Sequence, residues 1–153
     1  MEKLIIGSDH AGFKLKEELK RYLEKKGIRV EDAGTYSEER CDYPRYAAAV
    51  AEKVSAGRVK KGILICMTGI GNSIVANRFP GVRASLCCNI KAARLTREHN
   101  DSNVLVLGAA FIDGNLAKRI VQVWLHTSFA GGRHARRLNL IKKIERTIRS
   151  KKR

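Results

Sequence analysis

The chain alternates short apolar runs with longer amphipathic segments, and this alternation restricts its fold more than any other feature. The runs at 3–7, 62–66 and 103–107 are almost continuously apolar, which is typical of strands buried on both faces of a parallel sheet. The segment 13–26 instead places apolar residues at helical spacing, with Lys and Glu between them. The pattern predicts an α/β fold: a single Rossmann-like domain with a mostly parallel five-stranded sheet, helices on both faces and a C-terminal helix.

The remaining elements follow from the same spacing and from signals for helix starts. Pro44 opens one helix and Asp113 caps another, because both residues suit the first turn. Gly131-Gly132 is linker-like, and we expect it to let the last helix swing away from the body. The expected strands are 3–7, 28–31, 62–66, 82–87 and 103–107. The expected helices are 13–26, 44–55, 72–78, 90–99, 113–125 and 134–150.

The length and the charge of the chain narrow its organisation and its partners. At 153 residues it fits one domain, so we take 1–153 as a single domain with a basic tail at about 146–153. There are 31 Lys and Arg against 15 Asp and Glu, a net charge of +16, and ten of the basic residues lie after Gly132. A basic end is compatible with nucleic acid, an anionic membrane, phosphorylated small molecules or a solvated helix face.

Several classes of protein are disfavoured by the same composition. No apolar run reaches the ~18 residues of a membrane span, and 1–10 does not read as a secretory signal, so we expect a cytoplasmic protein without membrane association. The four cysteines fit a reducing compartment, and none forms a C-x-x-C pair, which makes a zinc ribbon or a disulfide framework a weak interpretation. Aromatic residues make up 6% and no nucleic-acid motif is present, so nucleic-acid binding is a remote alternative.

Reactive side chains follow two of the predicted strands. Asp9 and His10 come directly after the first strand, and Cys66 and Thr68 come at the end of the third. Ligands bind beyond the carboxyl ends of strands in open parallel sheets, so we expect these groups to lie near one another.

His99 and Asn100 precede the fifth strand instead. That turn lies at the opposite edge of the sheet in an ordinary doubly wound monomer. A catalytic His99 would then reach the site of a neighbouring subunit, which suggests a dimer.

The loop between the third strand and the next helix, residues 66–72, is the most informative segment. Its two glycines let backbone N–H groups converge before a helix N-terminus, an arrangement that binds an anion or an oxyanion. The same field favours the thiolate form of Cys66. From position alone, a small buried hydrophobe is the favoured interpretation of this cysteine, because free cysteines are often buried. The loop lacks the third glycine of G-x-G-x-x-G, it lacks Gly-Lys-Ser/Thr, and Asn72 replaces the arginine of a C-x5-R phosphatase.

A second informative segment precedes and opens the last helix. Arg133 and Arg137 are four residues apart and share one helix face, where two guanidinium groups suit a phosphate. A solvated basic patch is the alternative interpretation. His134 can add a donor, although a lone histidine at such a position is more often at the surface, and His126 is expected to be structural.

Together these segments resemble the type B ribose-5-phosphate isomerases, a family that includes galactose-6-phosphate isomerase subunits. The resemblance runs from Lys3 to about Glu145, with matching order and spacing. Its carriers are the segments 7–12, 34–35, 42–44, 65–71, 76–78, 97–101 and 131–134.

The resemblance implies an aldose–ketose isomerase that needs neither a cofactor nor a metal. It implies that Cys66 is the base that moves a proton between C1 and C2 through an enediolate. His99 opens the sugar ring with help from Asp9, and Thr68 with the amides of 69–71 forms the oxyanion hole.

The resemblance also implies a set of substrate contacts and a site formed between two subunits, in a homodimer or homotetramer. The implied substrate-binding residues are Asp9, His10, Tyr43 in the pocket wall, Met67, Thr68, Gly69, Ile70, Gly71, Asn100, Arg133 and Arg137.

Three positions depart from the family pattern. Met67 stands where a glycine is usual, Ala110 stands where many members carry an arginine, and Asn72 stands where one branch uses a glutamate base. The expected substrate pair is ribose 5-phosphate and ribulose 5-phosphate. Met67 and Ala110 keep a hexose 6-phosphate, such as allose or galactose 6-phosphate, as the alternative.

Overall fold

Five parallel strands form the centre of the protein in a computed structural model that describes residues 3–152. The strands lie side by side in the order β2-β1-β3-β5-β4, and every neighbouring pair is parallel. Their bounds are β1 Lys3–Ser8, β2 Arg29–Asp32, β3 Lys61–Cys66, β4 Ala84–Leu86 and β5 Val104–Gly108. The predicted α/β fold is confirmed, and the sheet is fully parallel.

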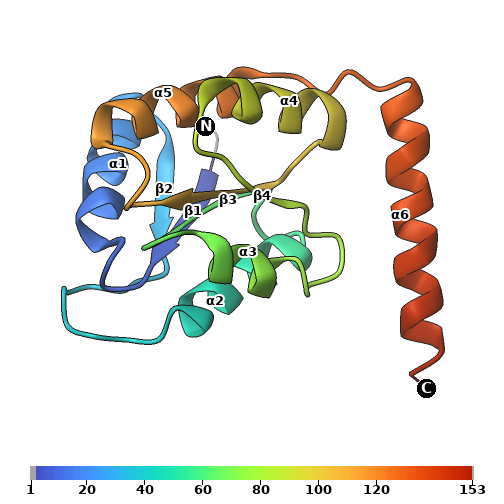
Figure 1. Ribbon diagram of the computed structural model, residues 1–153, viewed down its shortest axis with the longest axis horizontal. Coiled ribbons are helices and arrows are strands. Elements are labelled where there is room, and N and C mark those ends of the chain that lie inside the picture. Colours follow the sequence, from blue (N-terminus) through green and yellow to red (C-terminus); the bar gives the residue numbers. More distant parts are fainter. Residues whose placement is uncertain (1–2, 153) are drawn as a thin grey trace.

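Helices cover both faces of this sheet. In Figure 1, α4 and α5 lie on one side of the strands and α2 and α3 on the other. The bounds of the helices are α1 Phe13–Lys25, α2 Tyr43–Ser55, α3 Ile70–Ala76, α4 Ile90–Asn100, α5 Gly114–His126 and α6 Arg133–Ser150. Asp113 caps α5 as predicted, since its Oδ1 accepts a hydrogen bond of 2.7 Å from the Leu116 N–H.

Alternate residues of the interior strands enter two separate cores. In β3, Ile63 and Ile65 pack with α1, α4 and α5, whereas Leu64 packs with α2 and α3. The same alternation runs through β1 and β5. Strands that are buried on both faces must be apolar throughout, which explains their continuous apolar runs.

The edge strand β4 differs most from its predicted position, whereas the other edge strand, β2, is shifted by one residue, as is the interior strand β5. β2 lies at 29–32 rather than 28–31, and β4 spans only 84–86 rather than 82–87. Each edge strand pairs with one neighbour and is incompletely buried, so its sequence carries polar residues and a weaker pattern.

The start of α3 also corrects the prediction. The helix begins at Ile70, two residues before the expected start at Asn72, so Ile70 and Gly71 belong to its first turn and not to a loop. Gly69 precedes it with φ +78°, a left-handed conformation that favours glycine. Gly71 serves a different purpose, because a Cβ there would collide with the ring of Tyr43. The other interior boundaries agree with the prediction to within one or two residues.

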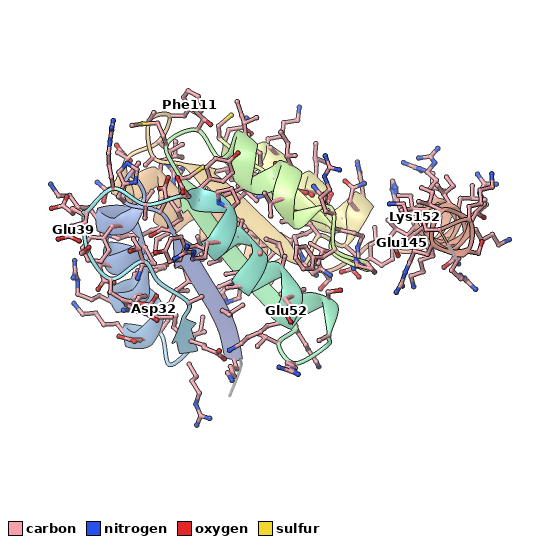
Figure 2. All side chains as sticks on the ribbon, turned by 90° about the horizontal axis from the view of Figure 1, so that it is seen from below. Asp32, Glu39, Glu52, Phe111, Glu145 and Lys152 are labelled. Atoms are coloured by element: carbon pink, nitrogen blue, oxygen red, sulfur yellow. The ribbon has the colours of Figure 1, made fainter. Side chains whose placement is uncertain are left out.

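The last helix stands away from the body (Figure 1), and Figure 2 shows it end-on with side chains on all sides. Gly131 and Gly132 precede it with φ +67° and +56°, so the pair turns the chain away as expected. Its apolar side chains Leu140, Ile141, Ile144 and Ile148 are all more than half exposed. In the basic tail, Arg153 lies outside the described residues. None of the helices described is long and apolar enough to cross a membrane.

Candidate active site

The thiol of Cys66 lies at the carboxyl end of β3, and the backbone that follows wraps around it. The side chain is 5% exposed and continues the alternation of β3 onto the face covered by α2 and α3. The Gly69 N–H donates a hydrogen bond of 3.1 Å to Cys66 Sγ. One residue earlier, Thr68 Oγ1 accepts a hydrogen bond of 3.2 Å from the Ile70 N–H. The loop therefore presents a buried thiol and the hydroxyl of Thr68, which acts as an acceptor here and can still donate its own proton in a hydrogen bond.

The turn after β5 supports this loop from behind. The Ala109 and Ala110 N–H groups donate to the carbonyls of Cys66 and Met67, each at 2.9 Å. Met67 and Ala110, which both depart from the family pattern, are thus neighbours in space. Met67 and Phe111 are each 56% exposed, and Phe111 points outward at this end of the sheet (Figure 2). The rim of the site is apolar.

Asp9 follows β1 and lies beside the end of β3. Ser8 pairs with Ile65 in the sheet, and the Asp9 N–H donates to the Ile65 carbonyl at 3.3 Å. The carboxylate of Asp9 is buried and accepts a hydrogen bond of 3.1 Å from the Gly12 N–H. The predicted proximity of the groups after β1 and β3 is found.

His10 and Tyr43 complete this group of side chains. The Cys41 N–H donates to His10 Nδ1 at 3.3 Å, which fixes the imidazole ring. Tyr43 begins α2, and its ring lies against Gly71. We refer to Asp9, His10, Tyr43, Cys66 and Thr68 as the thiol half-site.

A buried ionic frame holds the loop next to the thiol half-site. Lys16 is fully buried, and its ammonium lies 2.6 Å from Asp32 Oδ2. Asp32 Oδ1 accepts the Gly34 N–H at 2.9 Å. The carbonyl of Gly34 then accepts the Ser8 N–H, and the Thr35 N–H donates to the Ser8 carbonyl, both at 2.7 Å. The sequence did not reveal this frame, because Lys16 looks like one of many solvent-facing lysines of α1.

The charge of Asp32 depends on the lysines around it. Burial by itself raises the pKa of this carboxyl, but hydrogen bonds from Lys16 and Lys20 outweigh it and hold the pKa below its usual range. Asp32 is therefore ionised when the frame is formed.

A second group of predicted residues lies at α4 and α6. His99, in the last turn of α4, stacks on His134 with ring centroids 4.2 Å apart and an interplanar angle of 12°. His134 is buried, which corrects the expectation of a surface histidine. Its burial, followed by the electrostatic effects of His99, Arg133 and Arg137, lowers the pKa of His134. We refer to His99, Asn100, Arg133, His134 and Arg137 as the histidine half-site.

A buried arginine anchors the end of α4 under this half-site. Arg97 Nη1 donates to Asp101 Oδ1 at 2.8 Å and to the Ser102 carbonyl at 2.6 Å. Its guanidinium lies 6.0 Å from the ring centroid of Trp124, whose indole N–H donates to Ser102 Oγ at 2.8 Å.

The two half-sites lie at opposite ends of the strands. The end of α4 leads into Val104, which pairs with Gly62 near the start of β3, whereas Cys66 ends that strand. Four residues of strand span about 13 Å. One chain therefore does not bring His99, Asn100, Arg133 and Arg137 to the thiol of Cys66.

This arrangement defines a parallel α/β protein with a buried thiol at a strand end and a separate half-site rich in histidine and arginine. Residues 4–141 match the family model described as Ribose/Galactose Isomerase. Ribose-5-phosphate isomerase B of Escherichia coli is 49% identical over 145 residues, 95% of this chain and 97% of that protein.

Solved structures agree with these sequence comparisons. Ribose-5-phosphate isomerase B of Clostridium thermocellum has a TM-score of 0.93 at 48% identity, covering 95% of this chain and 99% of that one. The Mycoplasma genitalium enzyme with bound ribulose-5-phosphate has a TM-score of 0.90 at 39% identity, covering 94% and 96%. The chain belongs to the ribose/galactose isomerase family. The predicted family, its fold and its isomerase class are confirmed.

Proposed function

We propose that the chain interconverts ribose 5-phosphate and ribulose 5-phosphate through an enediolate. The observation that carries the proposal is the buried Cys66 thiol held against the Gly69 N–H at the carboxyl end of β3. The relatives from E. coli, C. thermocellum and M. genitalium are all named ribose-5-phosphate isomerase B. The M. genitalium structure also contains bound ribulose-5-phosphate. Both observations support this substrate pair.

The thiolate of Cys66 takes the proton from C2 of the open-chain aldose. The electron pair of the broken C–H bond forms the C1=C2 bond, and the negative charge passes to the carbonyl oxygen on C1. The Cys66 thiol then returns the proton to C1 while the hydroxyl proton on the C2 oxygen passes to the C1 oxygen, so that C2 becomes the carbonyl and C1 carries the hydroxyl of the ketose. A base positioned at the reacting carbon and donors at the developing oxyanion are what this step requires.

In this scheme the oxyanion is stabilised by the Thr68 hydroxyl and by the backbone amides of 69–71, of which the Gly69 N–H also contacts Cys66 Sγ and the Ile70 N–H also contacts Thr68 Oγ1. Because Thr68 Oγ1 already accepts the Ile70 N–H, its O–H is directed to the substrate. Neither a redox cofactor nor a metal enters this scheme, since the proton moves within one molecule.

The second buried cysteine, Cys87, does not compete for the role of base. Cys87 is 2% exposed, and its burial, with a smaller contribution from Cys88, raises the pKa of its thiol to about 11. At neutral pH this group is a neutral thiol. The four cysteines are all unpaired, which supports a reducing compartment and hence the cytoplasm.

Ring opening and phosphate binding belong to the histidine half-site of a second copy. In this scheme His99, with Asp9, moves the proton that opens the ring. His10 and Asn100 contact the sugar, and Arg133 and Arg137 bind its phosphate.

The apolar rim of the thiol half-site and the exposed apolar stripe of α6 support assembly into a homodimer or homotetramer. A site shared between copies also accounts for the separation of the two half-sites within one chain.

The first experiment is isomerisation of ribose 5-phosphate in the presence of EDTA, with ketose formation as the readout. Cys66→Ala should reduce kcat by about 1000-fold, as expected for loss of a catalytic base, and leave circular dichroism unchanged. Cys88→Ala is the matched control, because this thiol is exposed and should not contribute. Turnover retained in Cys66→Ala would contradict the role of the thiolate.

A hexose 6-phosphate is the second candidate substrate. The observation in its favour is the contact between Met67 and Ala110, two departures that lie together at the rim. Ala110 removes a long cationic side chain and Met67 adds an apolar one, so both change the shape of the same region. A panel of ribose, allose and galactose phosphates compared by kcat/KM decides between the two substrates.

A further inference from the structure

Asn72 lies in the first turn of α3, and its side chain is buried without a hydrogen-bond partner. The residue is 1% exposed, and neither its amide nitrogen nor its amide oxygen is paired. Among the buried side-chain nitrogen and oxygen atoms of residues 3–152, only Ser8 Oγ shares this condition. A buried amide without partners is unfavourable, so a native protein rarely retains one without a use for it.

The position of Asn72 on α3 places its side chain on the same face of the sheet as the thiol of Cys66. Asn72 and Ala76 are four residues apart and share the buried face of the helix. Ala76 packs in the core formed by α2, α3 and one face of the sheet. Helical side chains lean toward the N-terminal end of their helix, which is here the loop that follows β3. Cys66 leaves β3 on this same face.

We propose that Asn72 is a further catalytic residue, whose amide binds the oxygens on C1 and C2 of the open-chain sugar. This inference rests on the proposed function. The aldose presents a carbonyl oxygen on C1 and a hydroxyl on C2, and one amide offers a donor and an acceptor that match them. When the proton leaves C2, the amide N–H donates to the enediolate oxygen. Because the amide is neutral, it adds no negative charge beside the thiolate.

The experiment compares two asparagines of one segment that differ in their partners. Asn72→Leu replaces the unpaired amide with an apolar group of similar size. It should raise or maintain Tm while lowering kcat about 100-fold, as loss of an oxyanion donor does. Asn77 is the matched control, because its amide donates to the Ala84 carbonyl at 3.0 Å and accepts the Ala84 N–H at 2.9 Å. Asn77→Leu should lower Tm and leave kcat unchanged.

A third variant tests the chemistry of the amide. Asn72→Asp keeps the shape but places a carboxylate beside the enediolate. Its kcat relative to wild type at the same pH should therefore fall at neutral pH, and this ratio should recover in part as the carboxyl is protonated at lower pH. Wild-type kcat in Asn72→Leu would overturn the proposal, as would a lowered Tm with unchanged kcat. Wild-type protein that turns over no sugar phosphate would overturn the proposed function, and this result is recognisable because it does not depend on any variant.

Discussion

The thiol half-site and the histidine half-site differ in how the chain holds them. The thiol half-site is fixed from several directions: Cys66 by Gly69, Asp9 by Gly12, and the adjacent loop by Asp32. The histidine half-site is built from α4, which is anchored through Arg97, and from α6, which leaves the body after two glycines. The thiol half-site is held in place within the folded chain. The histidine half-site includes α6, a helix whose apolar side chains are exposed.

This difference indicates how catalysis is divided. Proton transfer at carbon tolerates little displacement, so the base and its donors lie on the rigid sheet edge. In the proposed function, the long guanidinium side chains of Arg133 and Arg137 bind the phosphate from α6, a helix whose apolar side chains are exposed. In the proposed assembly, docking of α6 and delivery of the phosphate ligands occur together.

The largest expected effect comes from mixing two inactive variants. Cys66→Ala removes the base from the thiol half-site, and His99→Ala removes the ring-opening group from the histidine half-site. In a site shared between copies, subunit exchange gives mixed dimers with one intact site, so an equal mixture should regain about a quarter of wild-type activity. Activity assays after co-refolding measure this recovery. A mixture as inactive as its components would show that both half-sites act within one chain.

A smaller effect is expected from the arginines of α6. Arg133→Ala should raise KM about 10- to 100-fold with little change in kcat, because it removes a charge-assisted hydrogen bond to the phosphate. Arg149→Ala, at the far end of the same helix, is the control for charge alone. Steady-state kinetics at two salt concentrations separates the two contributions. If KM rises equally in both variants, Arg133 acts only through long-range electrostatic attraction and not through direct contact with the phosphate.

The smallest effect concerns stability in acid. Because the pKa of Asp32 is lowered in the folded protein, its stabilisation is present above its unfolded pKa of about 4 and is lost as pH falls below that value. Asp32→Asn should lower Tm by about 5 °C at pH 7, because Glu17, 3.0 Å from the buried Lys16 ammonium, is then the carboxylate left to balance its charge. The variant should also make Tm depend less on pH in the acid range. Glu39, an exposed carboxylate (Figure 2), is the control as Glu39→Gln. If the Tm of Asp32→Asn falls toward acid pH as steeply as the Tm of the wild type, Asp32 does not stabilise the ionic frame.

The sequence predicted those parts of the fold in which burial acts on both faces of an element. β1, β3 and β5 were placed to within one residue at each end, since an interior parallel strand allows few polar residues. The edge strand β4 was predicted at 82–87 but spans 84–86, because pairing with one neighbour leaves its sequence mixed. The other edge strand, β2, was placed to within one residue at each end.

The thiol half-site was predictable for a related reason. Asp9, His10, Cys66 and Thr68 follow strand ends, and strand ends converge in a parallel sheet. The frame of Lys16 and Asp32, the stack of His99 on His134 and the unpaired amide of Asn72 were not, because each depends on which element packs over the side chain. No local pattern distinguishes a buried lysine or asparagine from an exposed one.

The single tryptophan of the chain gives the histidine half-site an optical label. Trp124 lies beneath the end of α4, with its indole N–H on Ser102 and the Arg97 guanidinium against its ring. Intrinsic fluorescence excited near 295 nm therefore reports on this region and not on the loop around Cys66. Subunit docking, phosphate binding and local unfolding at α4 can each be followed in the wild-type protein without an attached dye.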